Sequence, residues 1–270
     1  RDWSVTGDQT CALPNSDSVS TNDGDSTGTT PTESPTPAAG RVSAGQTFDN
    51  STGINVPADA SFDFAATDSF TIECWVKGPA APPGETQVFV GREDIPGNLS
   101  WFIGIRPSGI ASFNLFKSGD GGFLNGTTIL NDTKFYHVVG VRDASTNENR
   151  LYVDGVLEGT LPETYADGFA SSVDLNIGYF PTGNHFVGTL DEIALYNTAL
   201  TAAEIDEHYQ AGLAGEGIDP TLPPVNFPPG TISYWRLDET VTFDPAVAAT
   251  YTDSVSTNDG DSTGTTPTES

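Results

Sequence analysis

The chain has 270 residues with 37 Asp or Glu and only 10 Lys or Arg, which gives a formal net charge of −27. So few cations cannot neutralise a phosphate backbone, and anionic membranes would repel such a surface, which excludes nucleic acids and membrane surfaces as partners. No apolar run reaches the roughly 18 residues that a membrane span needs. The 29 Gly and 19 Pro are typical of short strands joined by many turns, and not of a helical bundle.

An internal repeat links the beginning of the sequence to its end. Residues 17–34 (DSVSTNDGDSTGTTPTES) are identical to residues 253–270, at an offset of 236 residues. The same offset pairs Asp2 with Asp238, so residues 237–270 look like the opening of a second copy of the unit. Self-similarity at this length indicates tandem whole domains. Because the chain contains no Met and no leader segment, we expect a processed product or an excerpt from a longer protein.

The residues between the repeats have the pattern of an all-β domain. Residues 69–77 (SFTIECWVK) alternate, with Phe70, Ile72, Cys74 and Val76 on one face. Further strands are predicted at residues 87–91, 101–105, 111–116, 135–142, 150–153, 156–158, 175–179 and 186–196. Asp154 and Gly155 supply a hairpin turn between two of them.

Three more segments follow these strands. The sequence predicts a helix over residues 201–211, where Thr201 and Glu204 form a capping box. Residues 216–229 contain five Pro and no periodicity, which is typical of a semi-rigid linker. Residues 230–236 (GTISYWR) alternate as a short strand should.

These segments resemble, in order, the LamG-like domains of the concanavalin A-like lectin/glucanase group. The resemblance is carried by the motifs FTIECWVK (70–77), FYHVV (135–139), LYVDG (151–155), GTLDEI (188–193) with LTAAEI (200–205), and YWRLDE (234–239). The sequence departs at Phe135, where these domains usually have Trp. The resemblance covers about residues 40–215 and 230–239, and it implies an all-β fold: a two-sheet antiparallel jelly-roll sandwich with one short C-terminal helix.

The resemblance also implies a site for Ca²⁺, which many such sandwiches hold between the exit of the first strand and the last strand. Asp191 matches the last-strand aspartate, Asp23 lies in an acidic NDGD turn, and Asp238 follows the opening strand. Carboxylates and carbonyl oxygens are the ligands that calcium prefers. The alternative is that Asp191 only accepts backbone N–H groups and that the NDGD turn is solvated.

The sequence does not contain the paired carboxylates of a glycosidase. Enzymes of this fold resemble one another in an E-x-D-x-(x)-E strand, which is absent, and Asp191 and Glu192 are adjacent, so on a strand they would point to opposite faces. His137 is expected to be a half-buried ring with satisfied hydrogen bonds. We therefore predict no enzyme activity. Sugar binding would need exposed aromatic rings, for which the candidates near loops are Trp101, Tyr165, Phe169, Tyr179 and Phe180.

The sequence leaves two covalent modifications undecided, a disulfide and N-linked glycosylation. Cys11 and Cys74 could form one disulfide in an extracytoplasmic protein, or Cys74 could be a small buried core residue. Four N-x-S/T sequons, about as many as chance would give, mark possible glycosylation at Asn50, Asn98, Asn125 and Asn131.

The domain organisation follows from these points. We expect a LamG-like sandwich over residues 1–215 that lacks its opening strand, a linker over 216–229, and over 230–270 an opening strand with the start of the next repeat. In the resembled family the opening strand pairs with the strand that carries the D-E motif. The side chains that would fill this edge are Ile232, Tyr234, Trp235 and Leu237.

The strand at residues 230–236 has two routes to this edge. It could fold back onto its own domain, or it could enter a neighbouring unit and form a head-to-tail fibre. We favour the second, and with it an extracellular, non-catalytic structural module whose partners are copies of itself. The alternative is a carbohydrate-binding, lectin-like adhesion module.

Overall fold

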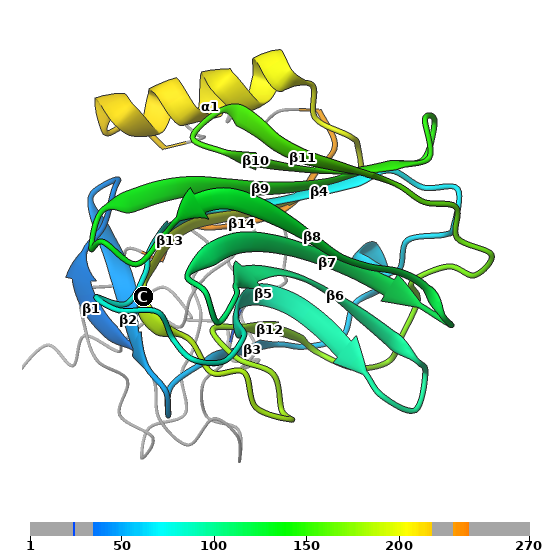
Figure 1. Ribbon diagram of the computed structural model, residues 1–270, viewed down its shortest axis with the longest axis horizontal. Helices are drawn as coiled ribbons and strands as arrows, with labels where there is room; N and C mark the ends of the chain where they lie inside the picture. The colour runs from blue at the N-terminus through cyan, green and yellow to red at the C-terminus, as the bar shows by residue number, and fades with distance from the viewer. Residues whose placement is uncertain (1–23, 25–34, 218–228, 238–270) are drawn as a thin grey trace, which may run out of the picture.

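Two antiparallel sheets pack face to face in this structure, which is a computed structural model (Figure 1). It describes Gly24, residues 35–217 and residues 229–237. The inner faces carry the apolar positions of the alternating segments, so Ile72 and Cys74 meet Ile103 and Phe113 in one core. The predicted jelly-roll sandwich with one short helix is confirmed.

The first sheet contains, in spatial order, β1 (Thr36–Ala39), β2 (Ala44–Asp49), β13 (Val187–Tyr196), β4 (Phe70–Lys77), β9 (Phe135–Asp143), β10 (Glu148–Val153) and β11 (Val156–Pro162). The hairpin between β10 and β11 turns at Asp154 and Gly155, which both have positive φ as the sequence predicts. A last strand, β14 (Thr231–Trp235), pairs with β13 outside this order.

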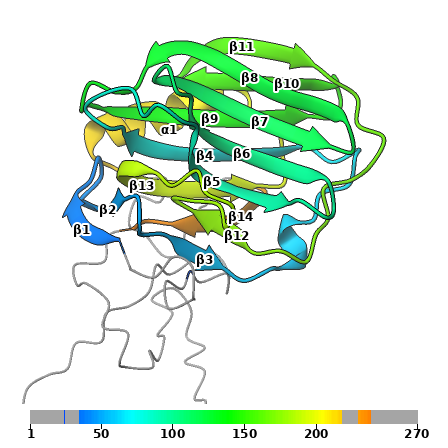
Figure 2. The same cartoon turned by 60° about the horizontal axis from the view of Figure 1, so that its bottom comes forward.

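The second sheet contains, in spatial order, β3 (Ile54–Val56), β12 (Leu175–Ile177), β5 (Gln87–Asp94), β6 (Leu99–Ile105), β7 (Ile110–Lys117) and β8 (Asp120–Ile129). A 3₁₀ helix, η1 (Ala60–Phe62), connects β3 to β4. Figure 2 shows β5, β6, β7 and β8 in front, with α1 (Ala202–Ala214) behind them on the far side of the sandwich.

Helix α1 lies on the outer face of the first sheet (Figure 1). The predicted capping box is present, since Thr201 Oγ1 accepts from the Glu204 backbone and the Glu204 carboxylate accepts from the Thr201 backbone. The helix continues three residues beyond the predicted end and stops at Gly215, whose φ is 78°. At Gly212 an added Cβ would lie 2.3 Å from the Trp75 ring, so glycine permits this close contact between helix and sheet.

Strand β14 fills the predicted edge within its own chain. Trp235 pairs with Ile193 and Tyr234 pairs with Ala194, both on β13. Tyr234, Trp235 and Leu237 are fully buried and Ile232 packs against the core. The single chain thus takes the self-complementing route, and residues 229–237 belong to the sandwich. Insertion into a neighbouring unit stays a prediction.

Candidate functional site

Helix α1 does not cover the outer face of the second sheet, since it lies on the other sheet (Figure 2), and we call the face without the helix the open face. Strand pairing places outward side chains in rows across β5, β6, β7 and β8. One row runs Gly91, Phe102, Asn114, Phe123, and the next runs Glu93, Ser100, Phe116, Gly121. Side chains in such rows are direct cross-strand neighbours, so aromatic, amide, hydroxyl and carboxylate groups are gathered on one surface.

Phe102 stands at the centre of an aromatic cluster on this face. Its ring centroid lies 5.9 Å from that of Phe123 and 5.4 Å from that of Phe180, and both pairs are edge-to-face. Gly91 makes room for it, since an added Cβ would lie 2.4 Å from the Phe102 Cβ. Phe102 and Phe180 are buried, whereas Phe123 is 46% exposed. Phe123 therefore presents a ring to solvent, and the Arg106 guanidinium lies 3.8 Å from its centroid.

An open pocket of about 420 Å³ lies beside this cluster. Its lining combines the aromatic rings with hydroxyl, amide and carboxylate groups: Thr86, Glu93, Ser100, Phe102, Asn114, Phe116, Gly122, Phe123, Phe180 and Asn184. Two of the amides are held in place: Asn114 Nδ2 donates to the Ser100 carbonyl at 3.2 Å, and Asn184 Nδ2 donates to the Thr86 carbonyl at 2.9 Å. A largely apolar pocket with a few fixed polar groups is typical of a small-molecule site.

A second open pocket of about 560 Å³ lies next to the first and shares Glu93 with it. Its lining is richer in amide and carboxylate groups: Asn55, Glu93, Asp94, Ile95, Pro96, Ser172, Val173, Asp174, Asn176, Tyr179, Pro181 and Thr182. Asn176 Nδ2 donates to Asn55 Oδ1 at 2.7 Å, and the Tyr179 hydroxyl donates to the same oxygen. The two pockets meet at Glu93 on β5, and we call the pair of them the groove.

The five aromatic rings that the sequence offers as candidates for sugar binding are not exposed. Trp101, Tyr165 and Phe169 belong to the core between the sheets, and all five predicted rings are at most 5% exposed. Only Tyr179 and Phe180 border the groove, as buried walls. The sequence analysis missed Phe102, Asn114 and Phe123. The first two are the outward positions of strands whose alternating partners fill the core, and that alternation was the available signal.

Asp191 is fully buried in the first sheet. Its Oδ2 accepts from the backbone N–H groups of Arg41, at 2.6 Å, and Val42, at 2.8 Å, and so fixes the turn between β1 and β2. Residues 35–217 and 229–237 contain no group of three acidic, His or Cys side chains that could hold a metal. Asp23 and Asp238 lie outside the described residues, so the calcium site stays a prediction.

Glu192, next to Asp191, lies in a β-bulge with a φ of 50°, which interrupts the alternation expected for this pair. Its carboxylate accepts from the hydroxyl of Tyr234 on β14. Because both carboxylates are buried and engaged with neighbouring elements, they hold β1, β2 and β14 on β13.

A buried polar cluster lies between the first sheet and α1. The Glu73 carboxylate contacts His137 Nε2 at 3.1 Å and His208 Nδ1 at 3.0 Å, and it accepts from the Tyr196 hydroxyl at 2.5 Å. Burial alone would raise the pKa of Glu73, but His208 and His137 outweigh it and hold the pKa well below its usual range. His137 is 1% exposed and its Nδ1 has no hydrogen-bond partner among the described residues, so the prediction of a half-buried ring with satisfied hydrogen bonds is wrong in both parts.

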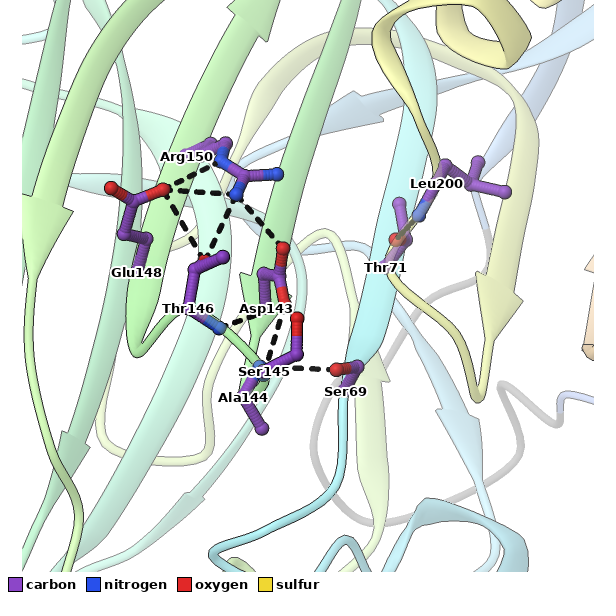
Figure 3. Close-up of polar contacts among 9 residues, drawn as sticks. All are labelled: Ser69, Thr71, Asp143, Ala144, Ser145, Thr146, Glu148, Arg150 and Leu200. Carbon is purple, nitrogen blue, oxygen red and sulfur yellow. Dashed lines mark hydrogen bonds and ion pairs between the residues drawn. The ribbon is translucent and has the colours of Figure 1, made fainter.

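Another polar cluster lies at the turn between β9 and β10 (Figure 3). Arg150 Nη2 lies 2.8 Å from Asp143 Oδ2 and 2.9 Å from Glu148 Oε2. Burial would raise the pKa of Asp143, but hydrogen bonds from Ser145 and Arg150 lower it to about 2. Ser69 lies just before β4, and its Oγ accepts from the Ala144 backbone N–H at 3.0 Å (Figure 3). These contacts stabilise the hairpin of β9 and β10. None of the residues that make them lines either pocket of the groove.

The predicted modification sites have different outcomes. Cys74 is buried in the core, and Cys11 lies outside the described residues, so the disulfide between them stays a prediction. Asn50, Asn98 and Asn125 are exposed and Asn131 is partly buried. Their glycosylation stays a prediction. Within the described residues, no helix is long and apolar enough to cross a membrane.

Comparisons with known proteins agree with this geometry. A sequence model of the family described as "Concanavalin A-like lectin/glucanases superfamily" matches residues 48–206. A search of curated proteins gave no match.

Three solved structures share the fold. Domain 4 of AbnA, a GH43 extracellular arabinanase from Geobacillus stearothermophilus, in complex with arabinotriose, has a TM-score of 0.55 at 19% identity, over 72% of this chain and 92% of that one. A putative carbohydrate binding protein from Bacteroides ovatus has a TM-score of 0.54 at 21% identity, over 73% of this chain and 52% of that one. The binding domain of Paraclostridial Mosquitocidal Protein 1 has a TM-score of 0.56 at 16% identity, over 70% of this chain and 50% of that one. The chain thus spans about half the length of the last two.

Proposed function

Because this chain belongs to the concanavalin A-like lectin/glucanases superfamily, we propose that it is an extracellular, non-catalytic module that binds carbohydrate in the groove. The observation that carries the proposal is the half-exposed ring of Phe123, set beside Phe102 among fixed amide and hydroxyl groups. Sugars present apolar C–H faces and a rim of hydroxyls, so a ring with polar neighbours matches both parts. Domain 4 of AbnA, crystallised with arabinotriose, supports it by similarity.

Binding without hydrolysis is part of this proposal. The family includes glucanases, which need two carboxylates facing one bond. Asp191 and Glu192 are buried in the first sheet, away from the groove, and each takes hydrogen bonds from a neighbouring element. We expect no reducing sugar to be released from β-glucans, galactans or arabinans. Release that a single Asp or Glu substitution abolishes would contradict this.

A glycan array, followed by calorimetry of each hit, tests binding. Phe123→Ala should weaken affinity about tenfold or more, since loss of a stacking ring costs ~1–2 kcal/mol. Val156→Ala is the matched control, because Val156 is 64% exposed on β11 of the other sheet. An array without hits, or equal losses in both variants, would contradict the proposal.

The second candidate function is assembly through β14. It is supported by the repeat, which predicts a copy of β14 ahead of each unit, and by the single edge on β13 that β14 fills. In a tandem or multi-chain array, two strands of one sequence would compete for that edge. A chain ending at Gly215 should aggregate or unfold, and a peptide of residues 230–239 should rescue it. A stable, monomeric truncated chain would exclude this function.

A further inference from the structure

We infer that the groove takes an oligosaccharide without carboxylate groups, neutral or amine-bearing, that occupies both pockets. This inference rests on the proposed carbohydrate binding and specifies its ligand. It excludes sialylated glycans and uronic acid polymers as ligands.

The two pockets are adjacent and meet at Glu93, which bears on the length of the ligand. Glu93 borders both, and the segment after β12 runs along both, with Phe180 in the first pocket and Pro181 and Thr182 in the second. The Thr182 hydroxyl donates to the Glu93 carboxylate and so fixes the boundary between them. Each pocket, at about 420 and 560 Å³, falls within the usual range for a small-molecule site. A ligand that fills one pocket can therefore extend across β5 into the other.

The charged lining of the groove is acidic. Glu93, Asp94 and Asp174 border the second pocket. Among the described residues that line the two pockets, none is Lys, Arg or His. Asp174 is held by Asn55 Nδ2 at 3.3 Å and by the Ala58 backbone at 3.1 Å, which keeps its charge on the pocket wall. Carboxylate oxygens accept hydrogen bonds from sugar hydroxyls, whereas a ligand carboxylate would meet like charges.

The cations near the groove are held by other groups. Arg92, which is fully buried, donates to the Val173 carbonyl at 2.8 Å behind the second pocket. Arg106 Nη1 donates to Thr86 Oγ1 at 2.9 Å and its guanidinium packs on Phe123, at the far end of the first pocket. Lys117 Nζ donates to the Gly97 carbonyl at 2.8 Å, in the turn between β5 and β6. None of these cations lines the second pocket, and Arg92 is also paired with Asp63, so a ligand carboxylate there would meet more negative than positive charge.

The test compares acidic glycans with their uncharged counterparts and uses the full chain. The pairs are sialylated and desialylated N-acetyllactosamine, and free and methyl-esterified tetragalacturonate. At 20 mM salt the acidic member of each pair should bind more weakly than the neutral member, by a factor of about ten or more. In 1 M NaCl this difference in affinity should become smaller, because salt screens exposed charges. Asp174→Asn and Glu93→Gln should narrow this difference in affinity as well, because each removes one negative charge from the lining. Asp206→Asn makes the same change of charge on the exposed face of α1 and should leave the difference in affinity unchanged.

Chain length provides a second readout, with cello- or galacto-oligosaccharides of two and four units. The tetramer should bind about tenfold more tightly if both pockets are used. Acidic members that bind as well as neutral ones, a gap that both groove variants leave unchanged, or equal affinity for dimer and tetramer would overturn the inference. Absence of all glycan binding would instead overturn the proposed function.

Discussion

The outer faces of the two sheets carry similar residue types but use them in opposite ways. On the first sheet, Glu73, Trp75 and His137 are sealed beneath α1. On the second sheet, Glu93 and Phe123 face solvent along the groove. A helix packed on a polar, aromatic sheet face therefore buries that face, whereas the face without the helix remains accessible to a ligand.

The largest expected effect comes from removing the buried charge on the covered face. Glu73→Ala should lower the free energy of unfolding by about 3–5 kcal/mol, because His137 and His208 lose their shared partner inside the protein. Urea denaturation measures this. Glu93→Ala on the open face is the control and should change stability by less than about 0.5 kcal/mol. Similar losses in both variants would show that the faces do not differ as described.

A steric change between helix and sheet should have the next largest effect. Gly212→Ala would place a methyl group against the Trp75 ring, so we expect a loss of about 1–3 kcal/mol from overpacking, despite the better helix propensity of Ala. Thermal unfolding measures it. Ala214→Gly, in the last turn of α1, is the control for propensity alone. An unchanged or raised melting temperature in Gly212→Ala would mean that α1 docks less tightly than this structure shows.

The covered face should also be sensitive to pH. Burial would lower the pKa of His208, but Glu73 outweighs it and raises the pKa above 6.5. Protonated His208 therefore contributes stability below about pH 6.5, and this contribution is lost as pH rises through the raised folded pKa. The other titratable groups around this contact are Tyr196, His137, Glu204 and Glu207. The stability difference between wild type and His208→Gln should shrink from pH 6 to pH 9, measured by urea denaturation, and a constant difference would contradict it.

The smallest effect is expected on the open face. Phe123→Ala should cost less than about 1 kcal/mol of stability, because the ring is half exposed, while Phe113→Ala in the core should cost about 3–5 kcal/mol. Denaturation of both variants in one experiment measures the contrast. A large loss for Phe123→Ala would make that ring structural and would weaken its assignment to the groove.

Much of the fold could be predicted from the sequence because its core strands alternate cleanly. The strand at 69–77 and the helix after Thr201 are examples, since their side-chain periods and caps are local signals. Strand β8 was missed because Gly119, Gly121 and Gly122 read as turn residues, and they do have positive φ. It is held by pairing with β7, which a local pattern does not reveal.

The candidate site was less predictable because it depends on contacts between distant segments. Alternation shows which residues of one strand share a face, but the sheet order alone shows that Phe102 and Phe123 meet. The same limit applies to the covered face, where Glu73 and His208 are 135 residues apart in the sequence. Aromatic content near loops was a poor guide, because Trp101 and Tyr165 fill the core.

The placement of β14 has a consequence for how the chain can be connected. Both β14 and β2 run antiparallel to β13 and lie along the same side of it, β14 beside Ile193–Tyr196 and β2 beside Val187–Leu190. The end of β14 points toward the start of β2, where Gln46 Nε2 donates to the Leu237 carbonyl at 3.3 Å. A circular permutant that begins at β14, continues into β1 and ends after α1 would therefore preserve every strand pairing of the sandwich.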